Sequence, residues 1–322
     1  MPTICGPNNQ PKEPFAMLSD RPFETPTYLL ERAAAVPTCR MAIAGADHPV
    51  VIESVRQATE AGIIEPVLVG DPERTRDAAR DLDFDISGFE IVAADSEAAA
   101  CEAAAALAGG GEVGALMKGH VHSDAIMRAV LKRDAGLRTE RRASHIFHMT
   151  IPGSEQVLMI TDGALNVAPD LDTKIDIVRN AVDMAHALGN PEPRVAMLSG
   201  TESVIASMPS SVEAAEIVKR AADGAIPGAR IDGPFGFDNA LSPAAAELKG
   251  IGGPVAGRAD ILVVPNIETG NGLFKMMVYF MSAVAAGVVI GARVPIVLTS
   301  RADPPEARLA AAAIAAIIAA GK

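Results

Sequence analysis

The chain has 322 residues, of which 49% are hydrophobic and 21% are charged. A chain of this length and composition can bury a sizeable core, which excludes a disordered protein. Asp and Glu outnumber Lys and Arg by 40 to 28, giving a formal net charge of -12, and the sequence has no block of consecutive basic residues. Such an acidic surface makes nucleic acid and anionic membranes poor partners.

The cysteines and the apolar runs indicate the compartment. Cys5, Cys39 and Cys101 lie far apart and form no CxxC pair, so we expect a reducing cytoplasm without structural disulfides or zinc. The first residues lack the basic and apolar regions of a signal peptide, so we expect no export. The apolar runs at 276–292 and 309–321 are shorter than the roughly 20 residues that a membrane span requires. The sequence therefore predicts a soluble cytoplasmic protein.

Short runs rich in Val and Ile, bounded by Gly, Pro, Asp or Ser, predict buried strands. They lie at 41–44, 67–69, 90–93, 113–117, 157–160, 195–198, 261–264 and 294–298. Segments with helical character alternate with them, at 48–61, 95–107, 124–132, 173–188, 212–222, 273–286 and 305–320. The alternation predicts βαβ units and an α/β fold with mainly parallel sheets and helices on both faces.

The number of predicted strands exceeds what one sheet usually holds, which favours two α/β domains. His145, Pro152 and Gly153 interrupt the pattern within 141–153, where we expect the chain to cross to the second domain. A second crossing at 287–293 would return the tail to the first. We therefore expect one three-layer αβα domain at residues 1–148 plus 290–322, another at 149–289, and a cleft between them.

Polar residues directly after the predicted strands are candidates for a ligand site, because ligands bind beyond the carboxyl ends of parallel strands. These endings read MKGHVHSD, TDGALN, LSGTES, PNIETGNG and LTSRADPPE. Several combine Gly with Ser, Thr or Asn, so that backbone N–H groups can approach an anion. Lys118 and Arg301 supply the positive charge that an acidic protein needs to hold phosphate. A surface ion pair of Arg301 with Asp303 or Glu306 is the alternative.

The segments LMKG, ITDGALN, ETGNGLFK and PIVLTSRAD resemble the phosphate acetyltransferases and phosphate butyryltransferases, the phosphotransacylase family. The resemblance spans roughly residues 113–316. It implies a cleft between two domains, as in isocitrate and isopropylmalate dehydrogenases, and reversible transfer of an acetyl or short-chain acyl (butyryl) group between coenzyme A and inorganic phosphate. It also implies acyl-CoA, acyl phosphate and phosphate as partners, coenzyme A as a substrate, no metal or redox cofactor, and a homodimer or higher homo-oligomer.

The resemblance assigns roles to particular residues. Ser300 and Arg301 match catalytic positions, and Arg128 matches a phosphate-binding arginine with one residue of alignment slack. The substrate-binding residues that we expect from the motifs and strand endings are Lys118, Gly119, Thr269, Gly270, Asn271, Lys275, Asp303 and Glu306. Guanidinium groups can hold phosphate oxygens in pairs, and hydroxyl or amide donors can stabilise the oxyanion that forms at the acyl carbon.

The sequence departs from the acetyltransferase pattern at one position. Some members carry an aspartate, proposed as the base, six residues beyond the arginine, and that position here is Ala307. A thiol with a pKa near ~8.5 is mostly protonated at neutral pH, so a base or a positive field should help. Asp303 and Glu306 are neighbours that could replace the aspartate. The SRADPPE loop is closer to the butyryltransferase branch, which favours acyl groups longer than acetyl.

Several other residues have two readings. His120 with His122, or His145 with His148 on a helix, could bind a metal, but loop or packed histidines are the commoner case. Asp162 could cap the following helix instead of touching substrate.

Asp238 and Asn239 match a family segment that faces the cleft, although a structural turn would explain them equally well. Met159, Met276, Met277 and Met281 are expected in the core.

Three other functions compete with phosphate acyl transfer. A β-decarboxylating dehydrogenase would need clustered aspartates for a divalent metal, and the sequence shows no such spacing. An acyl-ACP:phosphate acyltransferase would need a basic docking patch. A non-catalytic small-ligand binding protein would usually carry an export signal.

Overall fold

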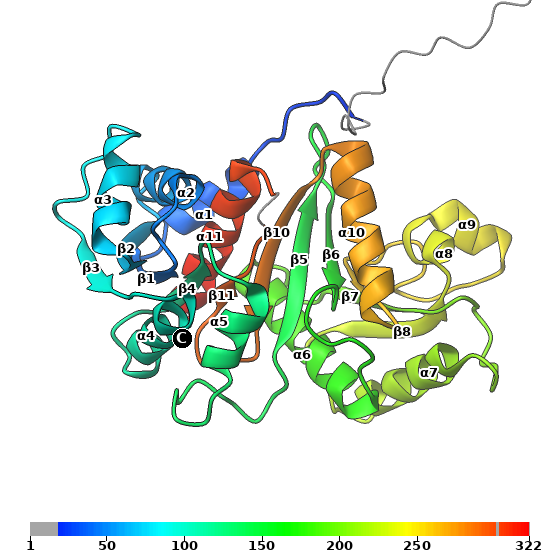
Figure 1. The fold of residues 1–322 in the computed structure, drawn as a ribbon. Helices are drawn as coiled ribbons and strands as arrows, with labels where there is room; N and C mark the ends of the chain where they lie inside the picture. The colour runs from blue at the N-terminus through cyan, green and yellow to red at the C-terminus, as the bar shows by residue number, and fades with distance from the viewer. Residues whose placement is uncertain (1–18, 301–302, 322) are drawn as a thin grey trace, which may run out of the picture.

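The computed structural model describes residues 19–300 and 303–321. In these ranges the strands form one 11-stranded sheet in the order β3-β2-β1-β4-β11-β10-β5-β6-β9-β7-β8, with helices packed on it (Figure 1). The strands are β1 (Cys39–Ala44), β2 (Ile64–Gly70), β3 (Glu90–Ala93), β4 (Ala115–Lys118), β5 (Ser144–Thr150), β6 (Val157–Thr161), β7 (Arg194–Leu198), β8 (Arg230–Phe235), β9 (Ile261–Val263), β10 (Val284–Ile290) and β11 (Ile296–Val297). The helices are α1 (Thr27–Ala34), α2 (Pro49–Glu60), α3 (Pro72–Arg80), α4 (Glu97–Gly109), α5 (Ser123–Val130), α6 (Leu171–Ala187), α7 (Pro209–Ala222), α8 (Phe237–Leu241), α9 (Pro243–Leu248), α10 (Ile267–Met281) and α11 (Pro305–Ala320).

Most neighbouring strands run parallel, which confirms the predicted α/β fold. Strands β3, β2, β1, β4 and β11 form one parallel group, and β6, β9, β7 and β8 form another. Strands β5 and β10 join the two groups through antiparallel pairing. Hydrogen bonding is therefore continuous across the sheet, and the division into domains near residues 148 and 290 stays a prediction.

Two strands, β5 and β10, occupy segments that the sequence predicted as a crossing between domains and as part of a helix. β5 occupies the expected crossing at 141–153, and all seven of its side chains are buried, so its two histidines are part of the sheet. The apolar run predicted as a helix at 273–286 divides at Ser282, which adopts a left-handed conformation with φ 50 and ends α10. The small and β-branched residues that follow then form β10, because such side chains pack well on a pleated surface.

The packing of the two faces of the sheet positions the site. One face carries a single apolar cluster that includes α1, α2, α6, α7 and α11. The alanines of α11 bring that helix close to β10 because their side chains are small. The opposite face carries two separate clusters, one beneath α4 and α5 and one beneath α10. The ends of the central strands meet between these two clusters.

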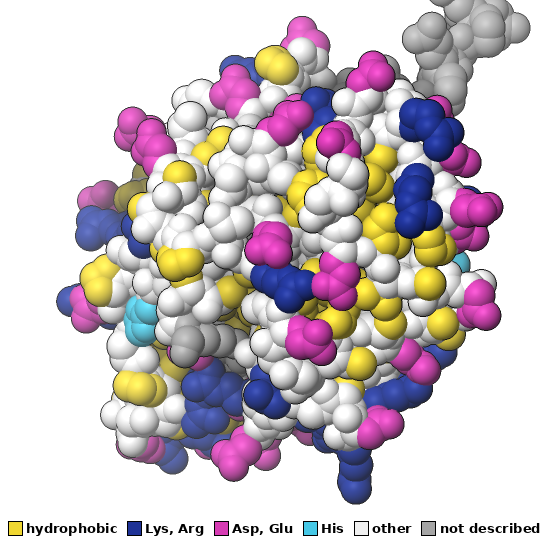
Figure 2. All heavy atoms as spheres, turned by 90° about the vertical axis from the view of Figure 1, so that its left-hand side faces the viewer, with side chains coloured by type: hydrophobic (Ala, Val, Ile, Leu, Met, Phe, Trp, Pro, Cys, Tyr) yellow, Lys and Arg dark blue, Asp and Glu magenta, His cyan; other side chains and the backbone are white. Residues whose placement is uncertain are grey.

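The surface shows a mixture of charges. In the view of Figure 2, acidic and basic side chains are interspersed over the face, with apolar groups between them. Met276 and Met281 lie on the outer side of α10 with exposed fractions of 43% and 40%, so the expectation that they belong to the core is wrong, while Met159 and Met277 are buried. None of the helices within 19–300 and 303–321 combines the length and apolar character needed to span a membrane.

Candidate active site

A cavity of about 400 Å³ lies between the two apolar clusters of the divided face. Its walls come from the segment after β4, the start of β5, the segment after β6, the first turns of α10 and the segment after β11. The lining residues that carry polar or charged groups are Lys118, His122, Ser123, His145, Asn271, Lys275, Thr299, Ser300 and Asp303. Five of the predicted site residues are therefore brought together from three distant parts of the chain.

Two lysines supply positive charge to this cavity. Lys118, the last residue of β4, has an exposed fraction of 7%, and its Nζ donates to the carbonyl oxygen of Val121 at 3.3 Å. Lys275 enters from α10 and is exposed to solvent. A buried lysine interacts with an anion more strongly than an exposed one, because less water screens its charge. Lys118 is therefore the stronger candidate for holding a phosphate group.

Ser300 and Asp303 form a turn at the rim of the cavity. The Ser300 N–H donates to Oδ2 of Asp303 at 2.6 Å, and the Asp303 N–H donates back to the Ser300 carbonyl at 3.2 Å. Burial raises the pKa of the Asp303 carboxyl, while the bond from Ser300 and the charges of Arg308, Lys118 and Lys275 act to lower it. Burial likewise lowers the pKa of Arg308.

The predicted residues at the start of α10 have different roles. Asn266 caps the helix, because its Oδ1 accepts from the N–H of Thr269 at 3.0 Å and from the Thr269 hydroxyl at 2.7 Å. Gly270 touches the backbone after β6, since a Cβ there would lie 2.8 Å from Cα of Gly163. Asn271 lines the cavity, and its Nδ2 donates to the Gly163 carbonyl at 3.3 Å. Thr269 and Gly270 thus shape the corner from which Asn271 and Lys275 reach the cavity.

Gly119 lies at a second, smaller cavity of about 120 Å³. This cavity shares Lys118, Thr299 and Ser300 with the first one and adds His48, His120 and Arg308. A Cβ on Gly119 would lie 2.4 Å from the carbonyl oxygen of Gly45. The close approach of the β1 and β4 ends therefore requires glycine at this position.

Two predicted site residues lie elsewhere, and a third is outside the described residues. Arg128 is on α5 and pairs with Asp124 at 2.9 Å, with 71% of its side chain exposed, and it is not among the described residues that line either cavity. Glu306, in the first turn of α11, is also not among them. Arg301 lies outside the described residues, so its position next to Ser300 is known from the sequence alone.

His145, Phe147 and Phe274 line the cavity, although sequence reasoning did not assign them to the site. The Phe147 and Phe274 rings stack at a centroid distance of 3.8 Å, and the His145 ring meets Phe147 edge-on at 4.3 Å. His145 bonds through Nε2 to the carbonyl oxygen of Leu298 at 2.9 Å, which ties β5 to the segment that leads to Ser300. Alternation along a strand at 144–150 could have found this face, but we expected the segment to be a crossing.

The histidine pairs considered as metal ligands make other contacts within the described ranges. His145 and His148 lie on a strand, not a helix, and their separation by three positions puts them on opposite faces of the sheet. His122 contacts Glu97 at 2.9 Å, and His120 stacks on His48 at 4.1 Å. No group of three potential metal-ligating side chains is found in residues 19–300 and 303–321.

Asp162 organises the turn after β6. Its Oδ1 accepts from the N–H groups of Ala164 at 3.0 Å and Leu165 at 2.9 Å, and its Oδ2 accepts from the His145 N–H at 3.2 Å. Asp162 is 2% exposed and its carboxylate supports this turn, whereas a cap of the following helix was one of the two interpretations of the sequence.

Asp238 and Asn239 also take part in a polar network. Asp238 pairs with Lys249 at 3.0 Å, and Asn239 donates to Glu202. These contacts match the structural-turn reading of the segment.

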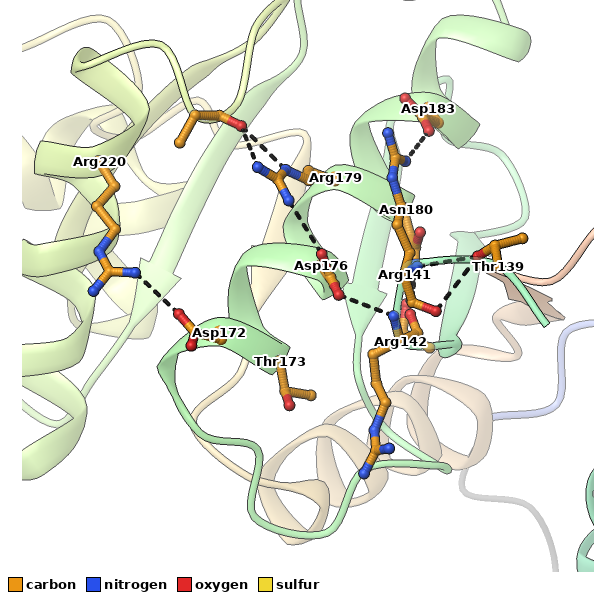
Figure 3. A network of polar contacts seen from close by, with 12 residues as sticks. Thr139, Arg141, Arg142, Asp172, Thr173, Asp176, Arg179, Asn180, Asp183 and Arg220 are labelled. Atoms are coloured by element: carbon orange, nitrogen blue, oxygen red, sulfur yellow. Dashed lines mark hydrogen bonds and ion pairs between the residues drawn. The ribbon is translucent and has the colours of Figure 1, made fainter. Parts of the chain in front are cut away.

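A groove of about 730 Å³ is lined by residues 138–143 and the start of α6. Figure 3 shows that Arg141, Asp172 and Asp176 of this groove are paired with charged residues beside it. Asp176 accepts from the Arg142 N–H at 2.9 Å and pairs with Arg179 at 3.2 Å, and Arg141 pairs with Asp183. Asp170, Asp172 and Asp176 also bring negative charge to the groove, which makes it less suited to an anionic substrate than the smaller cavity.

An α/β sheet with lysine, amide and hydroxyl groups gathered in one cavity at its central strand ends is typical of a protein that binds a small anionic ligand. Comparison with known proteins identifies the class. Residues 97–316 match the sequence profile named phosphate acetyl/butaryl transferase. The chain belongs to this family.

Individual relatives of this chain carry the names of the same family. A phosphate acetyltransferase from Rhizobium meliloti is 49% identical over 264 residues, covering 82% of this chain and 84% of the relative. A phosphate butyryltransferase from Clostridium beijerinckii is 40% identical over 292 residues, covering 91% and 97%. The crystal structure of a branched-chain phosphotransacylase from Enterococcus faecalis has a TM-score of 0.76 at 31% identity, covering 88% of this chain and 99% of that one. The predictions of family, of an acyltransferase and of phosphate as the acyl acceptor are confirmed.

Proposed function

We propose that the 400 Å³ cavity is where an acetyl or butyryl group passes between coenzyme A and inorganic phosphate. The observation that carries this assignment is the convergence of Lys118, Lys275, Asn271 and Ser300 on one cavity at the strand ends. An acyl phosphate is anionic at one end and apolar at the other. The cavity offers both environments, because Phe147, Phe274 and Leu298 line it beside the polar groups.

The roles of the residues follow from the charges that change during the reaction. Attack by the thiol on an acyl phosphate places negative charge on the carbonyl oxygen and releases phosphate. In our proposal Lys118 and Lys275 stabilise the phosphate, and Ser300 or Asn271 donates to the carbonyl oxygen. Holding both substrates in one cavity would supply much of the remaining rate acceleration.

The two arginines complete the proposal. Arg301 follows Ser300 directly, so a guanidinium there could hold phosphate oxygens in pairs. Arg128 would first have to leave Asp124, and because that ion pair is exposed, breaking it costs only ~0–1 kcal/mol. Arg128 can therefore exchange Asp124 for the oxygens of a phosphate group that lie outside the cavity.

The test is release of coenzyme A from acetyl-CoA and butyryl-CoA by the purified protein, followed with a thiol reagent. We expect thiol release to require phosphate and to persist in the presence of EDTA, because the proposed reaction needs no metal. Burial raises the pKa of Cys39 and Cys101 to about 11, so these thiols should contribute little background. A reaction without acyl-CoA serves as the control. No phosphate-dependent release with either substrate would overturn the proposal.

We further propose that the protein works as a homodimer or higher homo-oligomer in the cytoplasm. Support for assembly comes from the outer side of α10, where Met276, Tyr279, Phe280 and Met281 are 40% to 60% exposed. Apolar side chains grouped in this way are typical of protein interfaces. Support for a reducing compartment comes from Cys39 and Cys101, which are free thiols.

A further inference from the structure

The reaction described above requires a group that accepts the thiol proton, and the sequence left its identity open. Ala307 stands where some relatives have an aspartate, and its methyl group is fully buried against the apolar core. That position therefore cannot accept a proton. Two carboxylates, Asp303 and Glu306, remain close by in the sequence.

The structure separates the two candidates. Asp303 lines the cavity together with Lys118, Lys275 and Ser300, whereas Glu306 is not among the described residues that line it. The Asp303 carboxylate accepts from the Ser300 N–H through its Oδ2 atom. A carboxylate has several lone pairs, so this bond leaves capacity to accept a proton.

We propose that Asp303 is the general base that takes the proton from the coenzyme A thiol. This assignment rests on the proposed function of the cavity. The carboxylate is fixed by the Ser300 N–H on the same wall as the Ser300 hydroxyl. The group that accepts the proton and the group that donates to the acyl oxygen are thus held three residues apart in one turn.

The step balances without any additional reactant. The S–H bond breaks and its proton passes to Asp303, while sulfur forms a bond to the acyl carbon. The bond between that carbon and the phosphate oxygen then breaks. The proton moves from Asp303 to the departing phosphate, which leaves as hydrogen phosphate, and the carboxylate is regenerated. The reverse reaction uses the same groups in the opposite order.

The electrostatic surroundings suit this role. Burial raises the pKa of Asp303, which makes the carboxylate a stronger base, while the bond from Ser300 and the charges of Arg308, Lys118 and Lys275 oppose that shift. His122 and His145 also line the cavity, but His122 is paired with Glu97 at 2.9 Å, and His145 is fully buried with its Nε2 bonded to the Leu298 carbonyl oxygen, which favours Asp303 as the proton acceptor. The start of α11 just after Asp303 also favours negative charge.

The experiment compares wild-type protein with Asp303→Asn in acyl-CoA formation from acetyl phosphate and coenzyme A, across about pH 5–9. The amide can still accept from the Ser300 N–H through its oxygen, but it cannot take a proton. We expect kcat/KM for coenzyme A to fall ~100- to 10,000-fold, with little change in KM for acetyl phosphate. We also expect the acidic limb of the wild-type pH profile to disappear.

Asp303→Ala provides a second readout. Added formate should restore part of its activity, because a small carboxylate can enter the cavity and accept the proton, whereas a residue that only holds the turn would not be rescued. Asp85→Asn is the matched control, since Asp85 also accepts a backbone N–H, from Ser87 at 2.9 Å, but lies outside the cavity. It should retain wild-type activity.

The outcomes separate this assignment from the proposed function. Active wild-type protein with an Asp303→Asn variant that keeps its rate and acidic limb would overturn the role of Asp303 alone. An acidic limb that persists in Asp303→Asn and vanishes in Glu306→Gln would transfer the role to Glu306 and likewise overturn the assignment. Wild-type protein without acyl transfer would overturn both the function and the base.

Discussion

Replacing Lys118 by methionine tests whether the buried cation holds the phosphate group. The side chain is 7% exposed, and its Nζ also donates to the Val121 carbonyl, so its charge is held close to the cavity with little screening. A hydrogen bond to a charged group contributes ~1.5–3 kcal/mol. Since about 1.4 kcal/mol corresponds to a tenfold change in rate, Lys118→Met should lower kcat/KM for acetyl phosphate by ~10- to 150-fold.

Two further lysine variants calibrate this result. Lys275 lines the same cavity but is exposed, so Lys275→Met should cost less, about tenfold or below. Lys249 pairs with Glu202 and Asp238 and is not among the described residues that line the cavity, so Lys249→Met should leave the rate unchanged. The assay is initial-rate formation of acetyl-CoA at varied acetyl phosphate. If Lys118→Met and Lys249→Met have equal rates, the reasoning about the buried cation is refuted.

Three other predictions concern stability and assembly. Gly119→Ala should destabilise the fold by ~1–3 kcal/mol in a urea titration, because its Cβ would lie 2.4 Å from a backbone oxygen. Gly88→Ala, with no atom within 4 Å of the new Cβ, should have little effect. Equal effects of the two substitutions would contradict the packing argument. Burial lowers the pKa of His148 from 6.5 to about 4, so the unfolded state binds protons first as the pH falls. The free energy of unfolding should therefore drop by up to about 3 kcal/mol between pH 6.5 and 4. His148→Gln should show a shallower drop, and an unchanged pH dependence in this variant would contradict the role given to His148. Phe280→Asp should reduce the oligomer measured by sedimentation, because the ring is 60% exposed on α10, and an unchanged sedimentation coefficient would reject that interface.

The sequence predicts much of the sheet because buried parallel strands have a simple pattern. Residues 41–44, 90–93 and 195–198, for example, fall within β1, β3 and β7. It does not predict β5, β8 or β10, and at β5 and β10 the local pattern and the tertiary context disagree. β5 contains two histidines that become buried by packing, and β10 continues directly from an apolar helix that ends at Ser282.

The site residues likewise divide into those that the sequence indicates and those that only tertiary packing brings to the cavity. Lys118 was predictable because polar residues after strands meet at one edge of a sheet, and the family resemblance added Asn271, Lys275, Ser300 and Asp303. The apolar wall could not be predicted in this way.

Phe147 and Phe274 are far apart in the sequence and are typical core residues, and only the pairing of β5 beside β10 and β6 places them at the cavity. The different roles of Thr269, which bonds to the helix cap Asn266, and Asn271, which lines the cavity, could not be predicted either. Both residues belong to one motif, and only the helix geometry separates them.

The most direct test of the central claim is a crystal structure of the protein with bound acyl-CoA and a phosphate analogue. We predict that the thioester carbon lies in the 400 Å³ cavity, with the analogue in contact with Lys118 and the sulfur facing Asp303. A thioester bound instead in the 730 Å³ groove beside Arg141 and Asp176 would contradict the account.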